Sequence, residues 1–242
     1  MQLNTKAPFV LVHGAFHGGW SWRPIARELR AAGHEVFTPT QTGLGERSHL
    51  MSPAISMETF VFDVLNVILF EDLHDVVLVG HSYGGRSISG VVDRIPERIH
   101  KLVYIDGGLA PEGKSRLETM SPEARDARLQ SSMDFDGGIS VPPPPASQFG
   151  MSDPEQIAWV ERFLTPQPLG AERTALPLVH PLGNGRPATF VHCNSPAFPV
   201  TAPSADYARS RSDWRFREFP AGHNGIVTHP DQMAKLLLEE AA

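Results

Sequence analysis

The sequence predicts an α/β fold built on a mostly parallel sheet. Short runs rich in β-branched residues alternate along the chain with longer segments of helical length and periodicity, and this alternation is typical of strand–helix–strand units with right-handed crossovers. Two of the short runs, residues 10–12 and 76–79, are apolar without alternation, as expected for parallel strands covered on both faces. The length of 242 residues suffices for one domain, since domains commonly span about 100 to 200 residues.

The elements follow in order from these patterns. Six strands are expected, at residues 9–13, 35–38, 76–80, 101–105, 189–193 and 215–219. Four helices are expected beside them, at residues 22–32, 56–70, 84–94 and 230–240. Gly33 is a natural stop for the first helix, and Ser56 with an acidic residue after it is a suitable N-cap for the second. We assign residues 1–108 and 188–242 to this core.

Residues 109–187 do not follow this alternation of strands and helices. They contain four consecutive prolines, at 142–145, and one convincing helix, at 154–164, which begins with the N-cap Asp153 and a proline. A stiff surface linker would explain the prolines, but an insertion this long within a compact domain is usually functional. The insertion also carries four large aromatic residues, which are Phe135, Phe149, Trp159 and Phe163. We therefore expect an inserted lid, or cap, over the site.

Charge and cysteine content exclude several classes of protein. The net charge of −6 and the pI of about 6.0 provide no basic surface for nucleic acid. Cys193 is the only cysteine, so the chain forms no internal disulfide and no cysteine-based zinc cluster. Residues 1–6 lack the features of a signal peptide, and no apolar run reaches the roughly 18 residues that span a bilayer. We expect a cytoplasmic protein without membrane contact, and nothing in the sequence excludes a homodimer.

A serine on a tight turn is the first candidate for chemistry. Gly80-His81-Ser82-Tyr83-Gly84 follows an apolar strand and precedes a helix. Glycines on both sides of Ser82 allow a strained strand-to-helix turn that exposes the hydroxyl above the sheet. We interpret Ser82 as a nucleophile.

A serine needs a base to remove its proton, and His223 is the strongest of the eleven histidines for that role. It lies in a glycine-rich loop after the last expected strand, and ligands gather at the carboxyl ends of strands in open α/β sheets. We therefore expect His223 to act as the general base.

A second glycine-rich loop, residues 13–19, follows the first strand. Its Ala15 N–H and the N–H of Tyr83 are candidate donors to an oxyanion. Phe16 and His17 beside them, with Phe135 and Trp159 of the insertion, are expected to bind substrate. His13 and His17 have the spacing of metal ligands on a helix, but the glycines around them disfavour a helix and hence a metal site.

In this order of strand, loop, turn and late histidine, the chain resembles the α/β-hydrolase superfamily from Phe9 almost to its end. Residues 9–22, FVLVHGAFHGGWSW, are similar to the opening of a small group that contains plant methyl-ester esterases, hydroxynitrile lyases and related bacterial esterases. The resemblance implies a cofactor-free serine esterase with Ser82, His223, Ala15 and Tyr83 in the roles given above. The lyases have a threonine where this chain has Gly14 and a lysine where it has Asn224, so lyase activity is not expected.

The sequence leaves open which acidic residue would orient His223. Most of the superfamily places it after the penultimate strand, where this chain has Asn194 and no Asp or Glu between Arg186 and Asp206. Some members, including certain haloalkane dehalogenases, place it where this chain has Asp106. We favour Asp106 and keep two alternatives, which are Asp206 on a longer loop and Asn194 or no acid.

These residues predict an enzyme that cleaves a carboxylic ester of a small apolar or aromatic substrate through an acyl-serine intermediate, without a metal or cofactor. Lactones, thioesters and amides pass through a similar oxyanion, so a lactonase is the first alternative. A ligand-binding protein on the same fold is the second, because a fold does not determine function.

Overall fold

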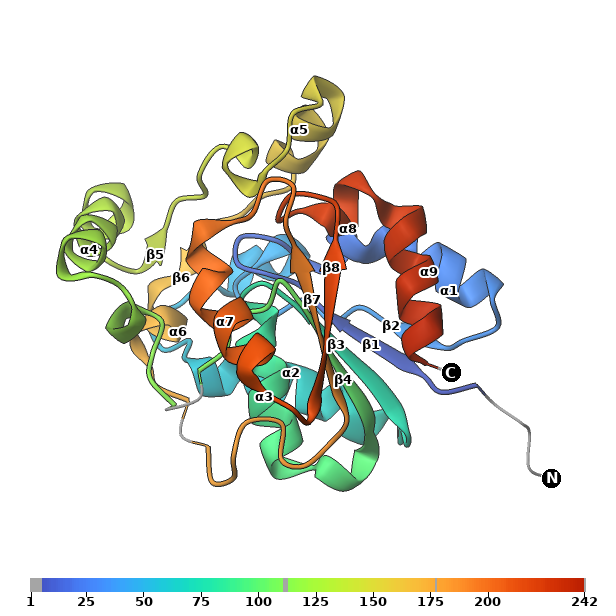
Figure 1. Ribbon diagram of the computed structural model, residues 1–242. Coiled ribbons are helices and arrows are strands. Elements are labelled where there is room, and N and C mark those ends of the chain that lie inside the picture. The colour runs from blue at the N-terminus through green and yellow to red at the C-terminus, as the bar shows by residue number, and fades with distance from the viewer. Residues whose placement is uncertain (1–5, 111–112, 177, 242) are drawn as a thin grey trace.

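The computed structural model describes residues 6–110, 113–176 and 178–241, and the start of the chain at residues 1–5 lies outside this range. Six parallel strands form the central sheet in the order β2-β1-β3-β4-β7-β8 (Figure 1). The strands are β1 (Phe9–Val12), β2 (Val36–Phe37), β3 (Val76–His81), β4 (Ile99–Ile105), β7 (Ala188–Cys193) and β8 (Trp214–Phe219). The predicted α/β fold with a mostly parallel sheet is therefore confirmed.

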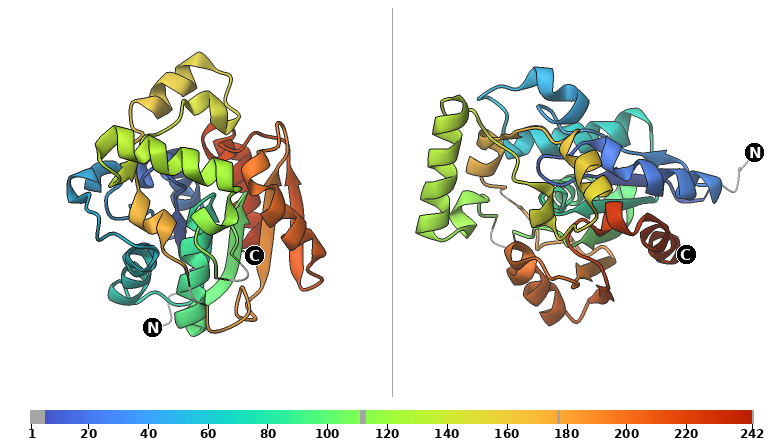
Figure 2. Two further views of the ribbon diagram at one scale, coloured as in Figure 1. Left: turned by 90° about the vertical axis from the view of Figure 1, so that its left-hand side faces the viewer. Right: turned by 90° about the horizontal axis from the view of Figure 1, so that it is seen from above.

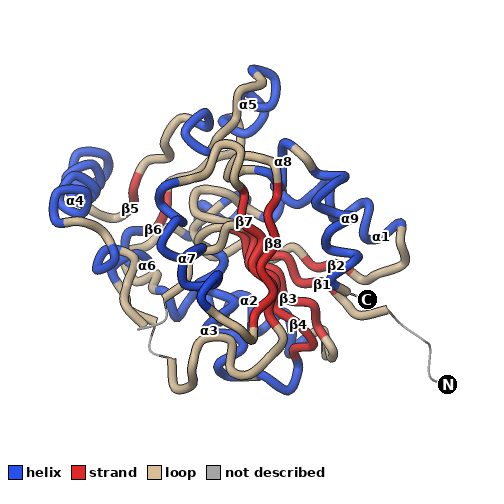
Figure 3. Tube along the Cα trace, viewed as in Figure 1, coloured by secondary structure: helices blue, strands red, loops and turns tan. Residues whose placement is uncertain are grey.

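Helices cover both faces of this sheet, as the tube in Figure 3 shows. They are α1 (Arg23–Ala31), α2 (Met57–Phe70), α3 (Gly84–Arg94), α7 (Ala202–Ser210), α8 (Gly225–Thr228) and α9 (Pro230–Glu240). Helices α1 and α9 pack on one face, and α2, α3 and α7 lie on the other (Figure 1).

Two hydrophobic cores result, one on each face. Val10 and Val12 belong to the core with α2 and α3, whereas Phe9 and Leu11 belong to the core with α1 and α9. Successive residues of a strand point to opposite faces, so both sets must be apolar, and this is the reason for the uninterrupted apolar runs in the sequence.

The segment between β4 and β7 leaves the sheet and returns to it. It contains α4 (Pro122–Asp136), α5 (Pro154–Glu161), α6 (Leu169–Arg173) and an antiparallel pair formed by β5 (Ser140–Val141) and β6 (Gln167–Pro168). Figure 2 shows α4 and α5 beyond the end of the sheet at which the strands finish. Asp153 caps α5 as expected, by accepting from the N–H groups of Glu155 and Gln156.

Sequence patterns did not reveal α4 or α7, and α5 ends three residues before the expected position. Ser132 is the only residue of α4 that is buried, so this helix has no apolar stripe by which it could be recognised.

Candidate active site

The turn between β3 and α3 carries Ser82. The residue adopts φ +50°, a strained conformation for a non-glycine residue, and its N–H donates to the carbonyl of Ile105 at 3.1 Å. A Cβ on Gly80 would lie 2.8 Å from the carbonyl carbon of Gly84, and one on Gly84 would lie 2.6 Å from the carbonyl oxygen of Val12. Both flanking glycines are therefore required by close backbone approach.

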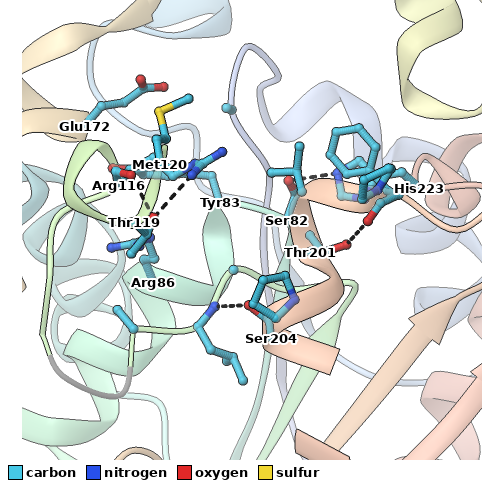
Figure 4. A pocket seen from close by; sticks show the side chains of 18 of the residues that line it. Ser82, Tyr83, Arg86, Arg116, Thr119, Met120, Glu172, Thr201, Ser204 and His223 are labelled. Carbon is cyan, nitrogen blue, oxygen red and sulfur yellow. Dashed lines mark hydrogen bonds between the residues drawn. The ribbon is translucent and has the colours of Figure 1, made fainter. Parts of the chain in front are cut away.

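His223 lies between Ser82 and Asp106 in a continuous hydrogen-bonded chain. Its Nε2 is 2.9 Å from Ser82 Oγ and its Nδ1 is 2.5 Å from Asp106 Oδ2. Asp106 is fully buried and His223 is 3% exposed. With the Nδ1 proton directed at the carboxylate, Nε2 is left to accept a proton from the serine. Figure 4 shows Ser82 and His223 facing each other at one side of the pocket.

Asp106 sits on the turn after β4 with φ +43°, and its N–H donates to the carbonyl of Val191. Its Oδ2 also accepts from Thr201 Oγ1 at 3.1 Å, and its Oδ1 lies 3.4 Å from His192 Nδ1. These neighbours hold the carboxylate in one orientation.

The two alternative acids lie elsewhere. Asp206 pairs with Arg209 at 3.0 Å, and its side chain is 78% exposed. Asn194 donates its amide to Glu218 at 2.8 Å. Of the three candidates, the structure brings Asp106 to His223.

Two of the groups around the acid were missed by sequence reasoning. Thr201 lies in a short 3-10 helix after a proline, where no local pattern marks it. His192 is the penultimate residue of β7, which pairs with β4, the strand that ends one residue before Asp106. A polar residue at the carboxyl end of a central strand was the available signal.

Ala15 and Tyr83 line the same pocket. A Cβ on Gly14 would lie 2.8 Å from Ser82 Cβ, so the loop after β1 passes directly over the serine. No described group accepts a hydrogen bond from the Ala15 or Tyr83 N–H. The two amides are therefore available to an oxygen that carries negative charge near Ser82.

Buried histidines support this loop as neutral side chains. Burial lowers the pKa of His13 to about 3 and that of His17 to about 4, and it lowers the pKa of His81 well below its usual value. His13 Nδ1 donates to Gly14 O, His17 Nδ1 to Ala15 O, and His81 Nε2 to His223 O. In the part of the chain that the structure describes, no three His, Cys, Asp or Glu side chains form a group that could hold a metal ion.

A cavity of about 830 Å³ opens above Ser82, within the size range of small-molecule sites. Much of its wall is apolar, with contributions from Phe16, Leu109, Ala110, Met120, Pro144, Phe149, Phe198 and Val200. Phe198 stacks on the His223 ring at 4.1 Å between centroids.

Of the residues expected to bind substrate, Phe16 and His17 line this cavity, whereas Phe135 and Trp159 do not. Phe135 is 51% exposed on α4. Trp159 packs edge-on against Trp20 at 5.2 Å, so it joins α5 to the core. The structure thus places these two aromatic residues outside the cavity lining, since an aromatic residue in an insertion can equally well serve packing.

A parallel sheet with a serine on a tight turn after a central strand, a histidine after the last strand and a buried aspartate between them defines an α/β hydrolase. The chain belongs to the alpha/beta hydrolase family, whose model matches residues 9–236.

Named relatives define the activity further. The carbendazim hydrolyzing esterase of Nocardioides sp. (strain SG-4G) is 38% identical over an aligned length of 244 residues. The alignment covers 96% of this chain and 98% of that protein. Methyl jasmonate esterase 1 of Vitis vinifera is 29% identical over 175 residues, 66% of this chain and 67% of its own. An extracellular α/β-hydrolase from a Paenibacillus species superimposes with a TM-score of 0.81 at 24% identity, covering 96% of this chain and 98% of its own. This protein is thus an ester hydrolase of the α/β-hydrolase family, and its resemblance to the plant methylesterase group is confirmed.

No helix within the described ranges is long and apolar enough to cross a membrane. The compartment in which the protein works stays a prediction.

Proposed function

We propose that the protein hydrolyses carboxylic esters through an acyl-serine intermediate, with Ser82 as nucleophile, His223 as general base and Asp106 as the acid that orients the base. The observation that carries this proposal is the hydrogen-bonded chain from Asp106 through His223 to Ser82 at the base of a cavity.

The chemistry follows from this geometry. His223 Nε2 takes the proton as Ser82 Oγ attacks the ester carbonyl, and the N–H groups of Ala15 and Tyr83 donate to the developing oxyanion. The imidazolium then gives the proton to the leaving alcohol, which leaves an acyl-serine. Water attacks the acyl-serine with His223 again as base, and the acid product departs. Asp106 stabilises the imidazolium in both halves of the reaction.

The apolar wall of the cavity favours a small apolar or aromatic group in the substrate. We propose that residues 109–187 act as a lid, since Leu109, Pro144 and Phe149 contribute to this wall. Carbendazim and methyl jasmonate, which occur in the names of two relatives, are the first candidates to test. Simple aryl lactones and thioesters complete the panel, because a similar oxyanion forms from each.

The test is hydrolysis of short-chain p-nitrophenyl esters by the wild type, Ser82→Ala and Ser212→Ala, with circular dichroism to establish folding. Ser212 is exposed on a turn before β8, so its variant is the matched control. Removing a nucleophilic serine alone costs about a millionfold in kcat in a well-studied protease, and we expect loss of detectable turnover in Ser82→Ala only. Equal turnover by folded Ser82→Ala would refute the serine mechanism.

A further inference from the structure

The cavity that contains Ser82 is apolar near the serine and charged on its far side. Its charged lining residues are four basic side chains, Arg86, Lys114, Arg116 and Arg128, and two acidic ones, Glu118 and Glu172. Figure 4 shows Arg86, Arg116 and Glu172 on the side opposite Ser82 and His223. The question is which of these charges are already compensated within the protein.

Both carboxylates have partners of their own. Glu172 is buried and receives two hydrogen bonds from the Arg128 guanidinium, one of them from Nε at 2.8 Å. Glu118 accepts from the backbone N–H of Ser115 at 2.7 Å. Arg128 and Glu172 thus form a bidentate pair, which is the strongest arrangement for these groups.

Arg86 and Arg116 are different. Among the described residues, neither forms an ion pair with a carboxylate. Arg86 Nη1 donates to the carbonyl of Lys114 at 2.7 Å, and Arg116 Nη1 to the hydroxyl of Thr119 at 3.2 Å. Arg86 is only 3% exposed, and burial lowers the pKa of both guanidinium groups, although arginine remains charged in proteins. Buried charges are normally paired, so the charge of Arg86 is incompletely compensated within the protein, and the partly exposed Arg116 near it adds a second positive charge.

Arg86 also lines the cavity that contains Ser82. It lies in the first turn of α3, four residues after Ser82. One small molecule in the cavity can therefore reach both the serine and this arginine.

We infer that the preferred substrate is an ester that carries a second, free carboxylate, which Arg86 and Arg116 bind while the ester group lies at Ser82. This inference rests on the proposed function and names its substrate class. The planar guanidinium matches a carboxylate with two parallel hydrogen bonds, and the low dielectric of the cavity strengthens the attraction. The apolar wall between the two ends would contact the body of the substrate.

The experiment compares p-nitrophenyl esters that carry this charge with counterparts in which the second carboxyl group is methylated and neutral. Mono-p-nitrophenyl adipate and suberate carry the free carboxylate, and their methyl p-nitrophenyl diesters are the neutral counterparts. The readout is the ratio of kcat/KM for the acid to kcat/KM for the neutral ester, which removes effects common to both. We expect a ratio of at least about ten in the wild type, since a hydrogen bond to a charged group contributes about 1.5–3 kcal/mol, or tenfold to a hundredfold.

Variants assign the preference to residues. Arg86→Gln and Arg116→Gln are each expected to lower the ratio about tenfold, and Arg86→Lys to restore part of it. Arg125→Gln is the control, because Arg125 lies on α4 outside the cavity lining and pairs with Asp126. If Arg86→Gln does not fold, Arg116→Gln provides the test.

The outcomes separate this inference from the serine mechanism. A wild-type ratio of one or less, with turnover that Ser82→Ala abolishes, would overturn the carboxylate site and leave the esterase proposal intact. A high ratio that both glutamine variants retain would show that the arginines serve only structure, and the inference would fall. Turnover that does not depend on Ser82 would overturn both proposals.

Discussion

The substitution Asp106→Asn tests the central hydrogen-bonded chain most directly. The variant is expected to fold, because asparagine has the shape of aspartate and the site offers partners to both ends of its amide. Its oxygen can accept from His223 Nδ1 and Thr201 Oγ1 in place of Asp106 Oδ2, and its NH₂ can face His192 Nδ1. What the variant loses is the negative charge beside the imidazolium.

The structure supports an order-of-magnitude value for that loss. Asp106 Oδ2 is 2.5 Å from His223 Nδ1, so the two charge centres lie about 4 Å apart, and unit charges at that separation interact by about 4 kcal/mol at an effective dielectric constant of about 20. Since about 1.4 kcal/mol corresponds to tenfold in rate, kcat is expected to fall about a thousandfold. An amide that turns its NH₂ toward His223 would also impose the wrong tautomer and bring the loss nearer to ten-thousandfold.

The assay is steady-state hydrolysis of a p-nitrophenyl ester, with thermal unfolding of each variant to establish folding. Asp206→Asn is the matched control, because Asp206 was an alternative acid and its side chain is exposed beside Arg209. We expect wild-type kcat in that control. A folded Asp106→Asn variant within tenfold of the wild type would refute the assignment of Asp106, as would an equal loss in Asp206→Asn.

Two further predictions concern a hydrogen bond to Asp106 and a buried ion pair beside the sheet. Thr201→Val removes the hydroxyl that donates to Asp106. Because a hydrogen bond to a charged group contributes about 1.5–3 kcal/mol, this substitution should lower kcat roughly tenfold, and thermal stability is the control measurement. Unchanged kcat would contradict a positioning role. Glu240 is buried against Lys101 and Arg217, which hold its pKa at about 2 although burial opposes ionisation. Because the pKa in the folded protein lies below that in the unfolded chain, the carboxylate stabilises the fold above about pH 4.5 and this contribution is lost as the pH falls toward 2. Glu240→Gln should therefore lower the free energy of unfolding in urea by about 3 kcal/mol at pH 7 and by much less near pH 2.5, and an equal effect at both pH values would contradict the reasoning.

The strands and the serine turn could be recognised in the sequence because their causes are local. A strand buried on both faces must be apolar at successive positions, and a turn that brings Gly84 against the backbone of Val12 leaves no room for a side chain. His223 could be recognised for a related reason, since a glycine-rich loop after a late strand lies at the edge where α/β sheets collect ligands.

The partners of those residues could not be recognised in the same way. Asp106, Asp206 and Asn194 were all compatible with the pattern, and the choice depends on which of them the turns after β4 and β7 bring within reach of His223. Thr201 reaches Asp106 across 95 residues of sequence. Such contacts follow from the order of strands in the sheet and leave no periodic signal.

By itself, the sequence determined the class of fold, the position of the candidate nucleophile and the histidine that faces it. Tertiary structure decided which carboxylate reaches His223, which aromatic residues line the cavity, and that Arg86 and Arg116 lie together opposite the serine. The physical reason is the range of the interactions. Burial and backbone sterics act on neighbouring residues and leave a local pattern, whereas hydrogen bonds and charges in the site join side chains that only the packed sheet and the returning segment bring together.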